Sequence, residues 1–292
     1  MTGAVCVRFL KPRRTAPHFQ PSTNAGIRPR ARPLVSAPTG VYLEAMSERT
    51  PPTAREPVFN LPPVIIASVA LLGVIHAIRV WLLTPDQEGW VIAAFSFVPV
   101  RITFPAAYDF DWPGGLAGDI WTFFSYAFLH ADWMHFGINA LWLAAFGTPL
   151  ARRFGPQRFV AFSLLGAAGG AAAHLALDPY SVAPLVGASA AIAAQMAAAA
   201  RFAFSPGGRL GGGGAFSADA DHRPALTIPE MIRNSRVVMF LGVWFVFNLL
   251  FGLLFTPPGI QSSQIAWDAH LGGFIVGLLF FPIFDPVARR VA

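Results

Sequence analysis

Long apolar stretches alternate with polar segments along most of this chain. A transmembrane helix needs about 20 consecutive, predominantly apolar residues. Stretches near that length lie at roughly 63–83, 133–151, 157–177, 188–204, 236–256 and 266–284. The fourth is the shortest, which fits a helix that starts below the membrane surface. The pattern predicts an all-α membrane protein with six transmembrane helices.

The composition points the same way. Of the 292 residues, 54% are hydrophobic and 12% are charged, and the mean hydropathy is +0.52. Soluble domains carry about 25% charged residues. The composition therefore excludes an ordinary soluble domain and indicates a polytopic protein of the lipid bilayer.

The basic residues follow membrane topology rather than a nucleic-acid interface. The net charge is +6, and all but one of the 21 basic residues are Arg. They gather before the first apolar stretch, in the 152–156 turn, in the 205–235 region and at the C-terminus, whereas the alternate loops are acidic. Positively charged loops stay in the cytoplasm. We therefore expect no nucleic-acid partner and both termini in the cytoplasm. The Arg- and Ala-rich usage favours a bacterial inner (plasma) membrane.

The chain is expected to have three regions. Residues 1–60 are rich in Pro and Arg and are predicted to be a disordered basic cytoplasmic tail. Residues 61–285 would form the six-helix domain, with a flexible Gly-rich cytoplasmic loop at 205–222, and residues 286–292 a cytoplasmic tail. The outer loop at 84–132 is too long for a plain connector, so we expect it to have structure of its own.

The N-terminal tail allows two interpretations. Residues 1–43 hold seven basic and no acidic residues, a pattern typical of an organellar transit peptide. Serine is sparse there, proline is abundant, and Met46 opens a segment that would serve as a short cytoplasmic N-terminus. We favour Met46 as the natural start, with residues 1–45 as an over-extended reading frame.

Ser189 is the candidate nucleophile. It stands at the start of the fourth apolar stretch, shortly after Gly187, which permits a close backbone approach. A helix N-terminus offers unpaired N–H groups and partial positive charge, and both favour an oxyanion there. The alternative is a serine that only caps the helix.

His270 is the candidate general base. Ala269, Gly273 and Gly277 recur every four residues, so they line a helix face that another helix can approach closely. His270 borders this face. Packing against the alanine-rich fourth helix would bring its imidazole within hydrogen-bond reach of Ser189. The alternative is a buried histidine bound only to a carbonyl group.

The segment HADWMHFGIN at 130–139 supplies candidate hydrogen-bond donors. His135 and Asn139 are four residues apart and share a helix face. Donors aimed at a developing oxyanion are worth roughly 3–4 kcal/mol each, whereas an interhelical polar pair, the alternative, contributes ~0.6 kcal/mol. We expect His130, near the outer end, to brace the outer loop through hydrogen bonds rather than to catalyse.

The remaining polar residues of the apolar stretches fit structural functions better. Asp268 lies two residues before His270, about 200° around the helix, so a Ser–His dyad is favoured over a triad. The helix dipole and nearness to the surface explain its charge. His76 and His174 have no matching partners and are interpreted as structural, and Arg79 is expected to snorkel outward.

Other intramembrane chemistries fit less well. A zinc protease would need HExxH, which is absent from the sequence. An aspartyl enzyme would need two carboxylates within the apolar stretches. The single cysteine, Cys6, excludes an intrachain disulfide and a cysteine-based metal site. We expect no metal and no cofactor.

Three motifs resemble those of the rhomboid family of intramembrane serine proteases. They are HxxxxHxxxN at 130–139, GxSx at 187–190 and AHxxGxxxG at 269–277, in this order on the second, fourth and sixth apolar stretches. The resemblance covers roughly residues 60–284. It implies the six-helix rhomboid fold, with a short central helix that presents the nucleophile. It also implies cleavage of transmembrane segments of other proteins without a metal or cofactor.

The resemblance assigns roles residue by residue. Ser189 is implied to be the nucleophile and His270 the base. His135 and Asn139, together with the Ser189 backbone N–H, are implied to form the oxyanion hole.

Two positions depart from the family pattern. Thr122 replaces the arginine that usually follows the tryptophan of the first loop, which puts the usual bracing of that loop in question. Ala190 stands where many members have Gly, and its methyl group could crowd the helix contact. The resemblance also implies that the fifth helix and the 257–265 loop act as gate and cap.

Two other classes of function compete with the protease. One is a catalytically silent rhomboid-like protein that binds transmembrane clients, and the other is a transporter or channel. Silent members generally lack the serine or the histidine, and a transporter would need charged residues facing the bundle at the midplane. The protease is therefore favoured, with transmembrane protein substrates and the lipid bilayer as partners. The sequence specifies no oligomeric state.

Overall fold

The structure, a computed structural model, describes four segments of the chain: residues 60–107, 110–212, 219–253 and 266–287. Residue contacts divide the chain after Glu56, and every described residue belongs to the second unit, Pro57–Ala292. Residues 1–59 of the predicted tail and the predicted cap at 257–265 lie outside the described residues.

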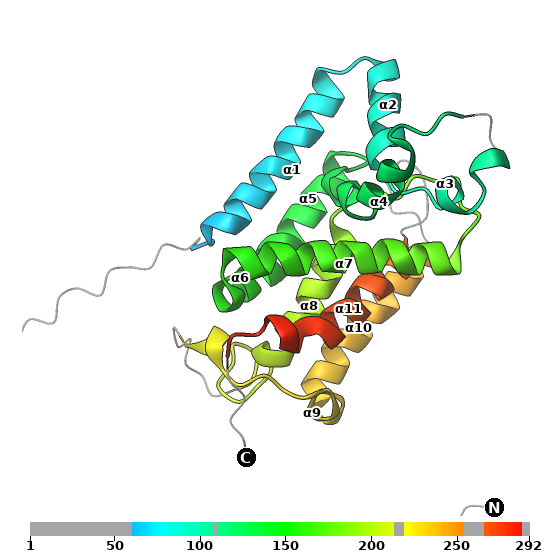
Figure 1. Cartoon of the computed structure of the whole chain (residues 1–292). Coiled ribbons are helices and arrows are strands. Elements are labelled where there is room, and N and C mark those ends of the chain that lie inside the picture. Colours follow the sequence, from blue (N-terminus) through cyan, green and yellow to red (C-terminus); the bar gives the residue numbers. More distant parts are fainter. Residues whose placement is uncertain (1–59, 108–109, 213–218, 254–265, 288–292) are drawn as a thin grey trace, which may run out of the picture. The chain divides into compact units, whose positions relative to one another are not determined.

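Helices form at each of the predicted apolar stretches (Figure 1). They are α1 (Pro63–Trp81), α5 (Trp133–Trp142), which continues through the π-helical turn η3 (Leu143–Gly147) into α6 (Thr148–Phe154), then α7 (Pro156–Leu177), α8 (Ser189–Ala203), α10 (Ser235–Leu253) and α11 (Trp267–Phe284). The connections hold α2 (Pro85–Phe95), α3 (Val100–Thr103), η1 (Pro105–Ala107), α4 (Gly115–Ser125), η2 (Tyr126–Phe128), η4 (Ala220–His222) and α9 (Ile228–Arg233). The described residues form no β-strand, so the all-α prediction is confirmed for them.

Capping residues and prolines determine where several helices begin. Asp132 caps α5, because its carboxylate accepts a hydrogen bond from the backbone N–H of His135 at 2.8 Å. Gly155, at φ +75°, ends α6, and Pro156 starts α7 immediately afterwards. The cap at Asp132 places His135 in the first turn of α5.

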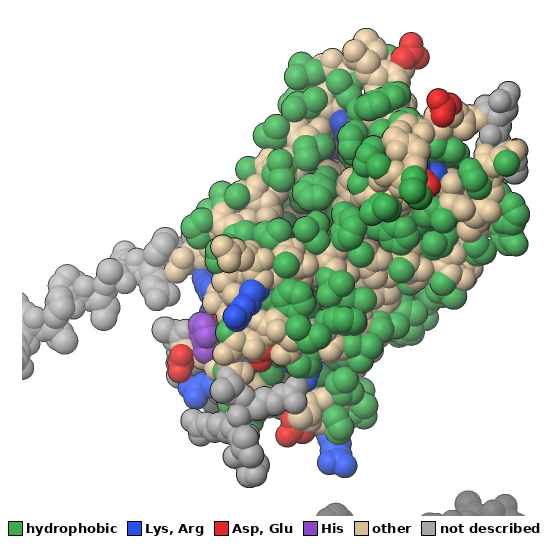
Figure 2. All heavy atoms as spheres, viewed as in Figure 1, with side chains coloured by type: hydrophobic (Ala, Val, Ile, Leu, Met, Phe, Trp, Pro, Cys, Tyr) green, Lys and Arg blue, Asp and Glu red, His purple; other side chains and the backbone are tan. Residues whose placement is uncertain are grey.

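Several helices suit a lipid environment. By length and composition, α1, α7 and α11 can cross a membrane, and α10 is a shorter apolar helix. Large apolar side chains point outward, among them Ile66 of α1 and Val246 of α10, which are both more than half exposed. Figure 2 shows hydrophobic side chains over the middle of the visible face and charged side chains near its ends. An apolar surface this extensive is typical of a membrane protein.

Helix α8 packs against both α7 and α11, which also contact each other. All of its residues from Ala190 to Phe202 are buried. Gly273 and Gly277 of α11 approach so closely that a side chain on either would overlap a backbone carbonyl of α8. A side chain at Gly170 of α7 would likewise overlap the Ala190 methyl group. Small residues thus let the three helix backbones pack closely, as in other membrane bundles.

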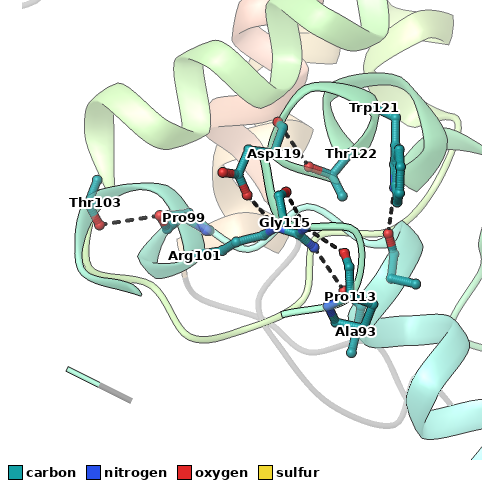
Figure 3. Close-up of polar contacts among 10 residues, drawn as sticks. Ala93, Pro99, Arg101, Thr103, Pro113, Gly115, Asp119, Trp121 and Thr122 are labelled. Carbon is teal, nitrogen blue, oxygen red and sulfur yellow. Dashed lines mark hydrogen bonds and ion pairs between the residues drawn. The ribbon is translucent and has the colours of Figure 1, made fainter. Parts of the chain in front are cut away.

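The outer loop is organised around Arg101 (Figure 3). Its guanidinium is buried and lies 2.6 Å from a carboxylate oxygen of Asp119. It also donates to the carbonyl groups of Pro113 at 2.7 Å and of Ala93 and Gly115 at 3.2 Å. Thr122, where the resemblance leads one to expect an arginine, is buried beside this cluster and donates to the Asp119 carbonyl. The arginine at the centre of this loop is Arg101.

The outer loop is bonded to the segment that leads into α8. Phe97 and Leu185 exchange backbone hydrogen bonds of 2.8 and 3.2 Å, which form an isolated antiparallel bridge. The Gly187 N–H donates to the Tyr126 carbonyl at 3.0 Å. The Thr103 hydroxyl donates to the Pro179 carbonyl at 2.6 Å. These bonds fix the backbone just before Ser189.

The described part of the 205–222 loop carries ion pairs and hydrogen bonds to other elements. Arg209 forms a bidentate ion pair with Asp221, whose side chain is buried. Arg153 of α6 donates to the Asp221 carbonyl and pairs with Asp285 at 2.8 Å. These ion pairs and hydrogen bonds tie the described residues of the loop to α6 and, through Arg153, to Asp285, whereas 213–218 lie outside the described residues.

Replacing Arg101 tests how far the outer loop depends on one side chain. Arg101→Ala should lower the free energy of unfolding by about 3 kcal/mol, because it leaves the half-buried Asp119 carboxylate and the carbonyl groups bound by Arg101 without this donor. Thermal unfolding in detergent measures the change. Arg158→Ala, at an exposed position of α7, is the control. Equal midpoints for the two variants would show that the Arg101 cluster is dispensable.

Candidate active site

The candidate nucleophile and base meet where α8 and α11 begin. Ser189 is the first residue of α8, and His270 lies in the first turn of α11. Their side chains lie 2.7 Å apart, from the serine Oγ to the imidazole Nε2. This distance is that of a strong hydrogen bond. An unprotonated Nε2 in this position can accept the hydroxyl proton of Ser189.

Gly187 packs closely against the imidazole ring of His135, beside the serine. Its φ of +119° is one that favours glycine. A Cβ atom on Gly187 would lie 2.7 Å from the Nε2 atom of His135 and 3.7 Å from the Oγ atom of Ser189. The Cβ position of residue 187 is therefore close to both the candidate nucleophile and a candidate oxyanion donor. A side chain there would collide with the His135 ring.

Asn139 lies one turn after His135 on the same face of α5. It is buried, and its Nδ2 atom donates to the His135 backbone carbonyl at 2.9 Å. Its Oδ1 atom has no hydrogen-bond partner among the described residues. The Nδ2 atom carries a second hydrogen that this bond does not use.

His130 braces the outer loop through its backbone rather than through its ring. Its carbonyl accepts a 2.7 Å hydrogen bond from Arg79, which also pairs with Glu88 of α2 at 3.0 Å. The His130 ring is fully buried, and its nitrogen atoms have no partner among the described residues. Burial, aided by the nearby His135, lowers the pKa of His130 to about 3, so the ring is neutral.

Arg79 and His76 complete the surroundings of His130. The prediction that Arg79 snorkels outward is wrong, because its side chain is buried between α1 and the outer loop, where Glu88 and the His130 carbonyl bind it. His76 is buried nearby, with its ring centroid 6.4 Å from that of His130.

Asp268 belongs to a separate pair. Its carboxylate lies 2.8 Å from the Nδ1 atom of His174 on α7 and also accepts from the Ala269 N–H at 2.7 Å. The expectation that His174 has no matching partner is therefore wrong, and both residues of this pair are buried. Asp268 lies about 200° around α11 from His270, so its side chain points towards α7 and away from Ser189.

Sequence reasoning missed Asn248 of α10. Its Oδ1 atom lies 2.6 Å from the Nδ1 atom of His270, on the opposite edge of the ring from Ser189. Its Nδ2 atom donates to the Trp267 carbonyl at 3.2 Å. One sequence signal could have found it: Asn248 is a lone amide in the apolar run 237–253, where polar residues are costly.

The described residues contain no group of three His, Cys, Asp or Glu side chains arranged to hold a metal ion. The α8–α11 junction brings together an alcohol and an imidazole. Such groups suit acyl transfer through a serine nucleophile.

Comparison with known proteins agrees with the sequence motifs. The family model of the rhomboid domain matches residues 117–285, more than half of the chain. The chain is also 28% identical, over 178 residues, to the RHOMBOID-like protein 12, mitochondrial, of Arabidopsis thaliana. That match covers 56% of this chain and 46% of the relative, so this chain spans less than half of the relative's length. On the strength of the domain match, this integral membrane protein belongs to the rhomboid family.

Proposed function

We propose that this protein is an intramembrane serine endopeptidase that cleaves peptide bonds in or near transmembrane segments of other membrane proteins. The observation that carries the proposal is the 2.7 Å contact between Ser189 Oγ and His270 Nε2 at the start of α8. A serine and a histidine from helices 81 residues apart in sequence meet in hydrogen-bond geometry. Polar groups brought together within an apolar bundle typically serve a function.

The proposed reaction proceeds through an acyl-enzyme. His270 Nε2 takes the hydroxyl proton while Ser189 Oγ attacks the carbonyl carbon of the substrate peptide bond. The tetrahedral intermediate collapses, its C–N bond breaks, and the imidazolium gives its proton to the leaving amine. Water, activated by the same imidazole, then hydrolyses the ester and restores the free serine. No metal or cofactor is needed for these steps.

The oxyanion would form beside Gly187. The three proposed donors are His135 Nε2, the Ser189 backbone N–H and Asn139. Support comes from the position of the His135 ring, whose Nε2 atom is 2.7 Å from the Cβ position of residue 187. Donors fixed before the reaction stabilise the developing charge without reorganisation.

We extend the proposal to the whole chain. Residues 61–285 would form a protease domain with six membrane spans, flanked by cytoplasmic tails at 1–60 and 286–292. Helices at each of the six predicted stretches support this count. In a bacterial inner membrane, the side of the arginine-rich loops is the cytoplasm.

Alanine variants of the dyad test the function. Ser189→Ala and His270→Ala should each abolish the release of membrane-protein fragments, because the first removes the nucleophile and the second removes its base. The measurement is a comparative proteomic inventory of fragments shed from membranes that carry each variant. Ser68→Ala is the control, since this α1 hydroxyl donates only to the Val64 carbonyl of its own helix.

The outcomes separate the protease from the silent client-binding alternative. A protease loses every specific fragment in both dyad variants and keeps them in Ser68→Ala. An inventory of fragments that is identical for wild type and both dyad variants would refute the proposal and favour the client-binding alternative.

A methyl group at position 187 tests the proposed oxyanion site. Gly187→Ala should reduce the cleavage rate by roughly 100-fold, the cost of losing one oxyanion donor, because the Cβ atom would crowd His135 Nε2. Steady-state cleavage of a purified substrate in detergent measures the rate. Gly137→Ala on α5 is the matched control, since its Cβ atom would meet nothing within 4 Å. Full activity of Gly187→Ala would place the oxyanion elsewhere.

Single cysteines test the proposed topology. In a Cys6→Ser background, Asp86→Cys should react with a membrane-impermeant maleimide added to intact cells, because α2 is assigned to the outer side. Gln157→Cys, at the start of α7, should react only after permeabilisation. Both positions are exposed. Labelling in the reverse order would overturn the assigned orientation.

A further inference from the structure

We propose that Asn248 is a positioning residue that holds the His270 imidazole in the tautomer able to act as a base towards Ser189. The proposal rests on the proposed function, because it assigns a partner to the proposed general base. Asn248 lies on α10, a helix that supplies neither member of the dyad.

The orientation of the Asn248 amide follows from its two contacts. The Trp267 backbone carbonyl, 3.2 Å away, can only accept a hydrogen bond, so the amide Nδ2 must face it. The Oδ1 atom then faces His270 Nδ1 at 2.6 Å. The reverse orientation would place the Asn248 Oδ1 atom against the Trp267 carbonyl oxygen, and two acceptors cannot form a hydrogen bond.

The amide orientation determines which ring nitrogen carries the proton. A carboxamide oxygen only accepts, so the His270 Nδ1 atom must be the donor of the 2.6 Å hydrogen bond. A neutral imidazole carries one N–H, which leaves Nε2 with a free lone pair. This lone pair points at the Ser189 hydroxyl, 2.7 Å away. Asn248 and Ser189 together fix both the tautomer and the plane of the ring.

Without Asn248, the ring could adopt the opposite tautomer. An Nε2–H group would donate to Ser189 Oγ and could not accept the serine proton. That tautomer is unproductive for attack on a peptide carbonyl. Asn248 therefore increases the fraction of protein molecules in which His270 is in the reactive tautomer. A change in this fraction affects kcat more than KM.

A neutral amide suits this position better than a carboxylate. Asn248 is 7% exposed, and an unpaired charge is expensive at that depth. Asp268 lies on the same helix as His270, but its carboxylate binds His174 and the Ala269 N–H rather than His270. The titratable groups with an electrostatic effect on His270 are His135 of α5 and Asp268. Neither contacts the Nδ1 edge that Asn248 occupies.

Nitrogen NMR of the histidine ring tests the tautomer directly. In protein labelled with ¹⁵N-histidine at alkaline pH, His270 should show a protonated Nδ1 and an unprotonated Nε2, assigned by comparison with His270→Gln. Asn248→Ala should shift both signals towards a mixture of tautomers. This readout needs no turnover, so it stands even if the protein cleaves nothing. A protonated Nε2 in the wild type, or unchanged signals in Asn248→Ala, would overturn the proposal.

Cleavage kinetics test the consequence for catalysis. Asn248→Ala should lower kcat by about 10- to 100-fold, with KM within about twofold of wild type, the usual cost of losing an orienting partner. Asn234→Ala, at the junction before α10, is the control and should leave both constants unchanged. A kcat for Asn248→Ala equal to that of wild type would refute the proposal and leave the dyad intact. Failure of the dyad itself would appear instead as equal activity of wild type and Ser189→Ala.

A third variant keeps the test decisive if Asn248→Ala does not fold. Asn248→Asp keeps the size of the side chain and an oxygen acceptor at Nδ1. Its carboxylate favours the imidazolium and so raises the pKa of the base. The fall of the cleavage rate on the acid side of the pH–rate profile should therefore begin at higher pH, whereas the variant stays active at pH values above that fall. An acid limb that coincides with that of wild type would contradict a contact between residue 248 and the base.

Discussion

The close contact between the backbones of α8 and α11 determines where the side chains of Ser189 and His270 lie. Gly273 and Gly277 leave no side chain between α11 and the carbonyl groups of α8. In lipid, packing of this kind rather than the hydrophobic effect holds helices together. Because both polar residues stand in the first turn of their helices, the same packing sets the 2.7 Å distance from Oγ to Nε2. The outer loop adds a second constraint, since its bonds to Leu185 and Gly187 fix the backbone before α8.

Most buried polar groups near these helices have specific partners. Asp268 binds His174, Arg79 binds the His130 carbonyl, and Arg101 gathers the carbonyl groups of the outer loop. The exceptions among the described residues include the rings of His76 and His130 and the Oδ1 atom of Asn139, which all lie on or beside α5. A buried polar atom without a partner costs about 1–3 kcal/mol. Other unpaired polar atoms, such as Trp112 Nε1 and Arg223 Nε, lie elsewhere in the described part of the fold.

Sequence patterns predicted the helices better than the contacts between them. Apolar stretch length placed α1 and α11 within about two residues of their observed ends, and the glycine spacing of 273 and 277 indicated the face that contacts α8. The partner of His174 and the function of Arg101 were not predictable, because they depend on how helices rotate and on the path of an irregular loop. Asn248 was missed for the same reason. Its lone position in an apolar run was visible, but not the direction of its side chain.

The most direct test of the central claim is covalent modification of Ser189 by a fluorophosphonate probe, mapped by mass spectrometry of the labelled peptide. The reaction requires an activated serine and access of water-soluble reagent to the start of α8. We expect wild-type protein in detergent to be labelled at Ser189 and His270→Ala, which keeps the serine, to lose the label. No labelling of the wild type under conditions in which a known serine hydrolase reacts, or equal labelling of His270→Ala, would contradict an activated Ser189–His270 pair.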